Sequence, residues 1–338
     1  MNASSHHGGP DAQGVPLYDF STNSNACGPC PTALDALAQA DTSRYPDPDY
    51  HALRQQLADF HGVAAHRILL AGSASEFIFR ITALAARRSA RAVSVPLHAY
   101  GDYAQAARAH GLAVVAAGAT ASLHWACEPS SPLGGAHRLL NWPDADGIHV
   151  LDRAYEPLRL HGVPSVSAAQ LEAVWQLFSP NKALGLTGVR AAYALAPSSE
   201  AGAKDAAALE QLCPSWPVGA HGVALLEAWT TSPAQAWLAE SRDLLQRWKV
   251  RQISLCESLG WACLPGDANF FCARPMRIAE AGITTLLKDL RLQGIKLRDA
   301  TSFNLPGHVR LGVRSPAAQD VLHRALTPWT NTRHDELP

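Results

Sequence analysis

Three short apolar runs, each followed by a polar residue, occupy the middle of this chain. Two of them end in Asn141 and Asp152, and the third ends at Phe178 and leads through a polar turn into Lys182. In open parallel α/β sheets, ligands bind beyond the carboxyl ends of the strands, which lie at one edge of the sheet. The spacing therefore predicts neighbouring strands around residues 140, 150 and 176, whose polar ends face a common ligand.

Lys182 has the most specific chemistry in this group. It stands on a turn after an apolar run, Gly185 and Gly188 follow it, and Arg190 lies just beyond them. Glycines let backbone segments approach closely, and a lysine that is desolvated near another cation loses its proton and forms Schiff bases. An ordinary surface lysine is the alternative, and the neighbouring residues favour the reactive one.

Lys182 and its neighbours match the requirements of a pyridoxal phosphate site. The lysine forms the aldimine, and Asp152 keeps the pyridine nitrogen protonated so that the ring takes up electrons. Asn141 and Tyr155 are the predicted contacts of the ring oxygen, and Arg190 is the predicted phosphate ligand. The alternatives are turn roles for Asp152 and Asn141 and a packing role for Tyr155.

Six motifs, in order along the chain, resemble those of one known family. They are residues 19–29 (D-F-S-T-N-S-N-A-C-G-P), 44–50 (R-Y-P-D-P-D-Y), 72–76 (G-S-A-S-E), 179–190 (S-P-N-K-A-L-G-L-T-G-V-R), 294–299 (G-I-K-L-R-D) and 308–313 (H-V-R-L-G-V). The chain resembles fold-type I, class I/II aminotransferases of the histidinol-phosphate aminotransferase group. Within that group, the cobalamin-biosynthesis branch, which includes threonine-phosphate decarboxylase, is the most similar. The resemblance runs from about residue 17 to about residue 328.

The resemblance implies a fold and an oligomer. The expected fold is α/β, of the pyridoxal-phosphate-dependent transferase fold type I, with a mostly parallel, mixed, seven-stranded sheet flanked by helices and a small α+β domain. We expect a flexible arm at 1–16, an N-terminal segment of the small domain at 17–44, a large domain at 45–240 and the C-terminal small domain at 241–338. The resemblance also implies a homodimer with shared active sites, in which Tyr45 enters the site of the partner.

The turn at residues 72–75 is predicted to hold the cofactor phosphate. Its amides open a helix, and helix N-termini attract phosphate whatever the side chains are; a plain strand–helix junction is the alternative. The predicted catalytic residues are Lys182, Asp152 and Tyr155. The predicted cofactor contacts are Tyr45, Ser73, Ala74, Ser75, Tyr103, Asn141, Asp152, Tyr155, Ser179, Lys182 and Arg190.

A stacking aromatic for the cofactor ring has two candidates, Tyr100 and Tyr103. Counting back from Gly111 favours Tyr103, whereas counting forward from Pro96 favours Tyr100. We favour Tyr103 and expect the other tyrosine to be a packing residue.

Arg310 and Arg298 are the predicted substrate ligands, because a guanidinium binds a carboxylate in a bidentate manner. Arg310 interrupts an apolar strand, where an unpaired charge is costly; a surface charge on an edge strand is the alternative. Asn25 and Asn141 are further predicted substrate contacts.

The expected substrate is an amino acid or a phosphorylated amino acid or amino alcohol, together with a 2-oxo acid. Loss of the Cα proton gives transamination, and loss of the carboxylate gives decarboxylation. The choice depends on how the substrate is clamped. We predict transamination first. Decarboxylation of threonine phosphate and transamination of histidinol phosphate are the alternatives.

The chain departs from the family pattern in two places. The family loop N-P-x-N-P-T-G is matched with residues 141–147, which read N-W-P-D-A-D-G, so Trp142 and Asp144 are expected to reshape the substrate pocket. Asn181 replaces a hydroxyl residue just before the lysine, so the phosphate site loses a hydroxyl and gains an amide.

Composition and cysteine usage limit the other functions. A net charge of −1 leaves no basic field for nucleic acid, and the longest apolar stretches are too short to span a membrane. With no signal-peptide pattern, a cytoplasmic location is expected. Cys27-Gly28-Pro29-Cys30 spells a thioredoxin-type dithiol, which makes a thiol oxidoreductase the remote alternative. No second C-x-x-C completes a metal site, so none is predicted.

Periodicity predicts the remaining elements. Helices are expected at 31–40, 53–60, 75–88, 100–110, within 211–259, and from 278 and 316; strands are expected at 91–95, 112–116, around 193, and at 261–264, 269–273, 296–297 and 309–313; residues 117–136 are expected to be rich in loops.

Overall fold

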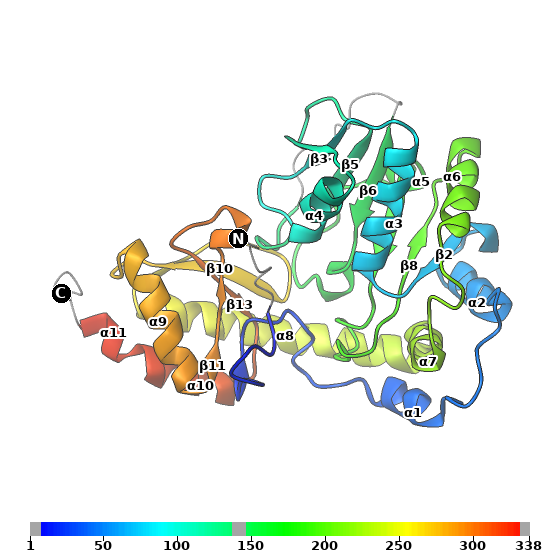
Figure 1. Cartoon of the computed structure of the whole chain (residues 1–338). Coiled ribbons are helices and arrows are strands. Elements are labelled where there is room, and N and C mark those ends of the chain that lie inside the picture. The colour runs from blue at the N-terminus through cyan, green and yellow to red at the C-terminus, as the bar shows by residue number, and fades with distance from the viewer. Residues whose placement is uncertain (1–7, 137–146, 332–338) are drawn as a thin grey trace.

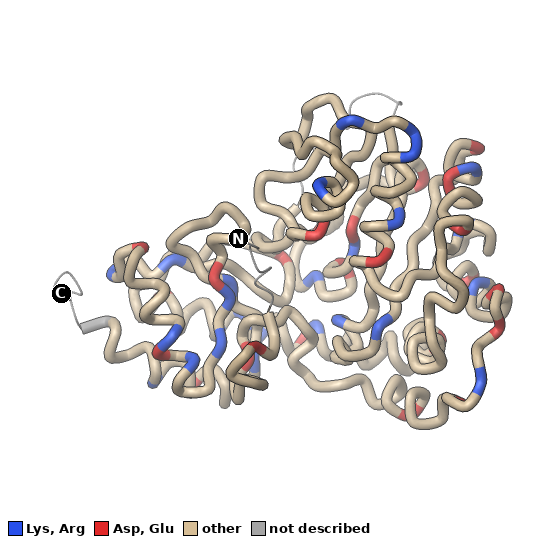
Figure 2. Tube along the Cα trace, in the orientation of Figure 1, with Lys and Arg blue, Asp and Glu red and all other residues tan. Residues whose placement is uncertain are grey.

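The structure is a computed structural model that describes residues 8–136 and 147–331. Two units of unequal size lie side by side, and the long helix α8 (Ser232–Ser258) runs beneath both of them (Figure 1). The larger unit is built on a seven-stranded sheet and the smaller one on a four-stranded sheet. We call them the seven-stranded unit and the four-stranded unit. Basic and acidic residues are interspersed over both in the view of Figure 2.

The seven-stranded sheet is mostly parallel. Its order is β2-β8-β7-β6-β5-β3-β4, and β8 alone runs antiparallel to its neighbours. The strands are β2 (Ile68–Ala71), β3 (Ala92–Val95), β4 (Ala113–Ala116), β5 (Leu123–Cys127), β6 (Ile148–Asp152), β7 (Trp175–Phe178) and β8 (Ala192–Leu195). The central strands are buried along their length, as expected when helices cover both faces of a sheet.

Two hydrophobic clusters fill the spaces between this sheet and its helices. Ile68 and Leu70 pack toward α2, α7 and α8, whereas Leu69 and Ala71 pack toward α3, α4 and α6 on the opposite face. This alternation along one strand follows from the two-residue repeat of β structure. The helices of this unit are α1 (Pro31–Gln39), α2 (His51–His61), α3 (Ala74–Arg87), α4 (Gly101–Ala109), α5 (Ala168–Glu172), α6 (Glu200–Gln211) and α7 (Ala220–Trp229).

The four-stranded unit is an antiparallel sheet covered by helices. The strand order is β12-β13-β10-β9, and a two-stranded parallel ladder joins β1 near the N-terminus to β11. Its elements are β1 (Tyr18–Asp19), β9 (Trp261–Cys263), β10 (Phe270–Pro275), α9 (Glu280–Leu292), β11 (Ile295–Lys296), β12 (Arg298–Asp299), β13 (Val309–Gly312), α10 (Pro316–Leu326) and α11 (Pro328–Asn331). The α/β fold class predicted from the sequence is confirmed, and the domain boundaries stay a prediction.

One strand lies where none was predicted. Residues 117–136 were expected to be rich in loops, but β5 lies within them and pairs with β6 over its whole length. The strand expected around residue 140, and Asn141 itself, lie outside the described residues. The two edges of β6 are occupied by β5 and β7. The polar residues beyond β5 therefore lie next to Asp152.

The described part of the predicted N-terminal arm contacts the four-stranded unit. Asp11 forms ion pairs of 2.9 Å with both Arg291 and Lys296, and the Gly9 amide donates to Ser21 Oγ at 2.9 Å. Asp11 is therefore attached to α9 and β11, and the flexible arm at 1–16 stays a prediction. Among the described residues, no helix is long and apolar enough to cross a membrane.

Candidate active site

A cavity of about 190 Å³ lies beyond the carboxyl ends of β6 and β7 in the seven-stranded unit. Its walls come from the turn before α3, the start of α4 and the loops that follow β5, β6 and β7. It gathers most of the residues predicted from the sequence: Ser73, Ala74, Ser75, Tyr103, Asp152, Tyr155, Ser179, Lys182 and Arg190.

Lys182 enters this cavity from a tight turn after β7. Its Nζ donates to Ser179 Oγ at 3.0 Å and lies 5.5 Å from the ring centre of Tyr155. Gly185 in the same turn has a φ of +71°, and a Cβ there would lie 2.4 Å from the Gly28 carbonyl oxygen. Only glycine allows residues 28–29 to pass so close, as the sequence predicted.

Asp152 is the last residue of β6 and is 5% exposed. Its Oδ2 accepts a hydrogen bond of 2.7 Å from the Tyr103 hydroxyl, and its Oδ1 accepts one of 2.9 Å from the Ala154 amide. Burial raises the pKa of Asp152, while the Tyr103 hydrogen bond and the positive charge of Lys182 oppose that rise. A cationic group in the cavity would favour the ionised carboxylate in the same way.

The N-terminus of α3 forms one end of the cavity. Ser73 caps the helix by accepting a hydrogen bond of 3.0 Å from the Glu76 amide, and the Ser75 hydroxyl lies 3.2 Å from that of Tyr100. Ser179 and Arg190 border the same cavity. Free amides, hydroxyls and a guanidinium at a helix N-terminus suit a phosphate group.

Asn181 does not supply the phosphate site with the amide donor that was expected. Its Nδ2 donates to the carbonyl oxygens of Val189 (3.2 Å) and Thr187 (3.5 Å), and its Oδ1 is buried without a partner. The side chain therefore holds the segment that precedes Arg190 against the lysine turn.

The two tyrosines have different surroundings. Tyr103 is 0% exposed, its ring is stacked on Trp125 at 4.3 Å, and its hydroxyl is bonded to Asp152. Tyr100 is half-buried and borders the cavity. Because no face of Tyr103 is accessible, these contacts do not support the predicted stacking on the cofactor, and Tyr100 becomes the better candidate.

Ser131 is a site residue that the sequence analysis missed. It lies in the loop after β5, is 5% exposed and borders the cavity together with Tyr155. A signal was present: residues 128–134 read E-P-S-S-P-L-G and match both prolines and the glycine of the family loop N-P-x-N-P-T-G. Residues 141–147 match neither proline, and Asn141 lies outside the described residues, so its contact with the ring oxygen stays a prediction.

Arg298 and Arg310 face each other across β12 and β13. They are 6% and 7% exposed, and the Phe303 ring lies 4.8 and 5.3 Å from their guanidinium carbons. Arg310 donates to Ser131 Oγ at 3.2 Å and to the Ser21 carbonyl, and its Nε has no partner. Within residues 8–136 and 147–331, neither guanidinium forms an ion pair. Burial lowers both pKa values, and for Arg298 the charge of Arg310 adds to the effect and brings the pKa to about 10.

Asn25 and the two cysteines nearby have structural contacts. Asn25 Nδ2 donates to the Ala183 carbonyl at 3.0 Å and its Oδ1 accepts from the Cys27 amide, so these contacts do not support its predicted role with the substrate. Burial raises the pKa of Cys27, which disfavours the thiolate. Cys30 is buried and precedes α1 without a strand before it. The thiol oxidoreductase alternative therefore has no structural support.

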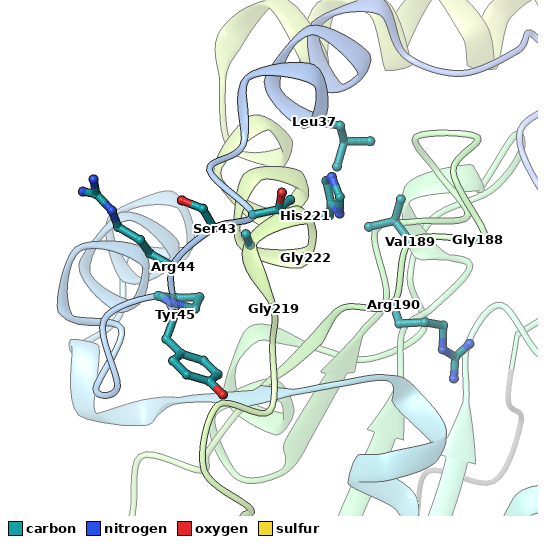
Figure 3. Close-up of a pocket in the computed structure, with 13 residues that line it drawn as sticks. Leu37, Ser43, Arg44, Tyr45, Gly188, Val189, Arg190, Gly219, His221 and Gly222 are labelled. Carbon is teal, nitrogen blue, oxygen red and sulfur yellow. The ribbon is translucent and has the colours of Figure 1, made fainter.

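Tyr45 lies outside the cavity of its own chain. It is 77% exposed, stacks on Trp216 at 4.4 Å and borders an open surface groove of about 920 Å³. Arg190 borders both this groove and the cavity, and Figure 3 shows it on the opposite side of the groove from Tyr45. The groove thus leads from the molecular surface to the phosphate end of the cavity.

Fold and cavity together define a pyridoxal phosphate enzyme of fold type I. The chain belongs to the aminotransferase class I and II family, whose model matches residues 15–130 and 124–326. It is 26% identical to histidinol-phosphate aminotransferase 2 of Burkholderia mallei over 91% of this chain and 90% of that protein. It is 28% identical to histidinol-phosphate aminotransferase 2 of Pseudomonas aeruginosa over 92% and 88%.

Solved structures show the same fold. The histidinol-phosphate aminotransferase of Clostridium acetobutylicum superposes with a TM-score of 0.80 at 19% identity, covering 93% of this chain and 99% of the other. The enzyme of Sinorhizobium meliloti, in complex with pyridoxal-5'-phosphate, gives 0.77 at 22% identity, covering 91% and 89%. The L-threonine-O-3-phosphate decarboxylase of Porphyromonas gingivalis gives 0.76 at 22% identity, covering 93% and 99%.

The cofactor of this family is pyridoxal phosphate, and the residues of the cavity fit it. A buried carboxylate suits the pyridine nitrogen, and a lysine amine that donates to a serine hydroxyl suits the aldehyde. The helix N-terminus of α3 with Arg190 suits the phosphate. All three stand around one cavity, as the cofactor requires.

Proposed function

We propose that this chain is an aminotransferase for a phosphorylated amino substrate, with a 2-oxo acid as the acceptor. The observation that carries the proposal is the pair Arg298 and Arg310. Two buried cations that face each other without a carboxylate call for a dianionic ligand, and phosphate fits guanidinium forks. The curated relatives that act on histidinol phosphate support this substrate class.

When bound, pyridoxal phosphate supplies an aldehyde that captures amines and a ring that takes up electrons. Lys182 then carries the proton between the substrate Cα and its product position, because its Nζ is the basic group that points into the cavity. Asp152 holds the proton of the pyridine nitrogen, and the Tyr103 hydroxyl keeps the Asp152 carboxylate oriented and ionised.

The remaining residues orient the reactants. Tyr155 and Ser131 would hold the ring oxygen of the cofactor, and Tyr100 would pack against its ring. Ser73, Ala74, Ser75, Ser179 and Arg190 line the cavity and would hold the cofactor phosphate. Arg310 and Arg298 would bind the anionic ends of the substrate and so fix its orientation.

We also propose a homodimer in which the surface groove is filled by a second copy of the chain. Tyr45 and Trp216 form an exposed aromatic pair at this groove, and such pairs are enriched at protein interfaces. Arg190 places the groove next to the phosphate end of the cavity, so the partner's Tyr45 would complete the phosphate site. A Tyr45→Ala variant that stays dimeric and binds the cofactor as tightly as wild type would contradict this role.

Two finer predictions rest on the sequence. A cytoplasmic location rests on seven cysteines that form no disulfide. A place in cobalamin biosynthesis rests on the motif resemblance.

The experiment that tests the function uses two substrates. The protein is incubated with histidinol phosphate plus 2-oxoglutarate and, separately, with threonine phosphate, and glutamate and CO₂ are measured. Glutamate formation supports transamination. CO₂ from threonine phosphate, without glutamate, supports the decarboxylase instead. A protein that never takes up the yellow cofactor refutes both.

A further inference from the structure

Arg159 lies behind the active site and binds three carboxylates from three separate segments. Its guanidinium lies 3.0 Å from Glu128, 2.8 Å from Glu156 and 3.4 Å from Asp267. The Arg159 side chain is 7% exposed and that of Glu128 is 2% exposed. None of these four residues borders the cavity. Two of the segments that they join carry Ser131 and Tyr155, which do border it.

The first carboxylate controls the loop that carries Ser131. Glu128 follows β5 directly and begins the loop of residues 128–135, which we call the β5 loop. Its amide donates to the Asp152 carbonyl at 3.0 Å, and its carboxylate also accepts from the Ser165 amide at 2.7 Å. Glu128 is thus fixed next to Asp152, and Arg159 supplies its positive counter-charge.

The second carboxylate belongs to the residue after Tyr155. Glu156 opens the short helix η2 (Glu156–Leu158) and is bound by both Nε and an Nη of Arg159. A bidentate guanidinium contact fixes direction as well as distance. Glu156 therefore fixes the backbone next to Tyr155. The Tyr155 ring packs edge-to-face on Phe270, with 4.8 Å between the ring centres.

The third carboxylate comes from the four-stranded unit. Asp267 lies in the loop of residues 264–269 between β9 and β10. Its amide donates to the Gly134 carbonyl in the β5 loop at 2.6 Å, and its carbonyl accepts from the Leu160 amide at 2.6 Å. The loop leads into Phe270, whose ring also lies 5.6 Å from the Arg310 guanidinium. Asp267 thus ties the substrate side of the site to both other segments.

The charges explain why an arginine is needed at this junction. Burial lowers the pKa of Arg159, but its bonds to Glu156 and Glu128 outweigh that effect and raise it, so the cation persists. A lysine would keep the charge, but its single ammonium cannot meet three carboxylates in fixed directions.

We propose that Arg159 is a positioning residue that holds Ser131 and Tyr155 in register with the arginine pair of the four-stranded unit. The inference rests on the proposed function, because it assigns Ser131 and Tyr155 to the ring oxygen of the cofactor. Through Ser131, which accepts from Arg310 at 3.2 Å, it also links cofactor geometry to substrate binding.

The test compares Arg159→Lys with Arg67→Lys. Arg67 is a matched control, because it is also buried and bound to one glutamate, Glu172 at 2.7 Å, but its partners Glu172 and Ala196 do not border the cavity. The visible absorbance of the cofactor-loaded protein is titrated with pH. In Arg159→Lys, the hydroxyls of Ser131 and Tyr155 should be held less firmly at the ring oxygen. The midpoint of the spectral titration should then rise by about one pH unit, and the substrate KM should rise several-fold. Both values should stay unchanged in Arg67→Lys.

A second measurement needs no cofactor. Amide hydrogen exchange of the β5 loop should accelerate in Arg159→Lys and in Asp267→Ala, which removes only the carboxylate that the four-stranded unit contributes. Arg67→Lys should leave it unchanged. If the loop and the spectral titration stay as in wild type, Arg159 is only a fold-stabilising residue and the inference is wrong. If wild-type protein takes up no cofactor while the loop still responds, the proposed function fails and the junction stands.

Discussion

The two sides of the active site differ in how their charges are matched. In the seven-stranded unit, Asp152 accepts hydrogen bonds from Tyr103 and Ala154, and Lys182 donates to Ser179. In the four-stranded unit, Arg298 and Arg310 face each other, and neither forms an ion pair within the described part of the chain.

This difference separates a resident ligand from one that is exchanged. A cofactor stays in place, so its contacts can be held in position by the chain's own hydrogen bonds. A substrate must bind and leave, so its ligands retain charge that only the substrate matches. The four-stranded unit does pair other arginines: Arg291 is bound to Asp11 at 2.9 Å. Arg298 and Arg310 differ from Arg291 in that they are buried opposite each other and form no ion pair among the described residues.

The largest expected effect comes from Lys182→Ala. Turnover should fall by orders of magnitude, because the lysine is both the covalent anchor and the proton carrier. The fold and non-covalent cofactor binding should remain, since Asp152, Arg190 and the N-terminus of α3 do not need the covalent link. Borohydride reduction should fix the cofactor to wild type and to the exposed control Lys204→Ala, and not to Lys182→Ala. Full activity of Lys182→Ala would refute the proposed site.

The next effect tests the substrate side. Arg310→Ala should keep the yellow cofactor and lose roughly 2–4 kcal/mol of substrate binding, the range for a desolvated charge pair. The loss should appear mainly in KM. Arg291→Ala, which removes an arginine of the same unit that is already paired, should leave KM unaltered. Equal KM values for wild type and Arg310→Ala would show that Arg310 does not bind the substrate.

A smaller effect is expected on the cofactor side from Tyr103→Phe. Burial raises the pKa of Asp152, and the Tyr103 hydrogen bond opposes this, so its loss should raise the pKa further. More of the carboxyl is then protonated at a given pH, and the acid limb of the kcat profile should move to higher pH. A lost hydrogen bond to a charged group is worth about 1.5–3 kcal/mol. Tyr100→Phe, whose hydroxyl lies near Ser75, is the control and should leave that limb in place.

Much of this architecture could be predicted from the sequence, because it depends on local patterns. The strand before Lys182, the carboxylate at the end of β6 and the helix after Ser73 each follow from an apolar run and the residue that ends it. Arg298 and Arg310 could be named as ligands because charges are rare in apolar strands. Their placement opposite each other depends on sheet register and came only from the structure.

The errors arose where local patterns are weak. The sequence of β5, L-H-W-A-C, lacks β-branched residues, so its pattern does not predict a strand within residues 117–136. Ser131 was missed for that reason. Tyr100 and Tyr103 could not be separated by counting, because the choice depends on which ring Trp125 covers. The junction at Arg159 joins residues far apart in sequence, which no local pattern reveals.

The smallest expected effect concerns the paired charges at the surface. Arg291 and Lys296 hold the pKa of Asp11 well below its ordinary value of 3.8. A lowered pKa means that the contact contributes fully at pH values above that ordinary value and is lost as the pH falls through the lowered one. Asp11→Asn should mimic the acid state at neutral pH. Amide exchange of residues 8–16 should accelerate, while KM and the cofactor spectrum stay constant. A change in KM would mean that the arm affects Arg298 and Arg310. The paired charges at the surface would then not be independent of the unmatched pair.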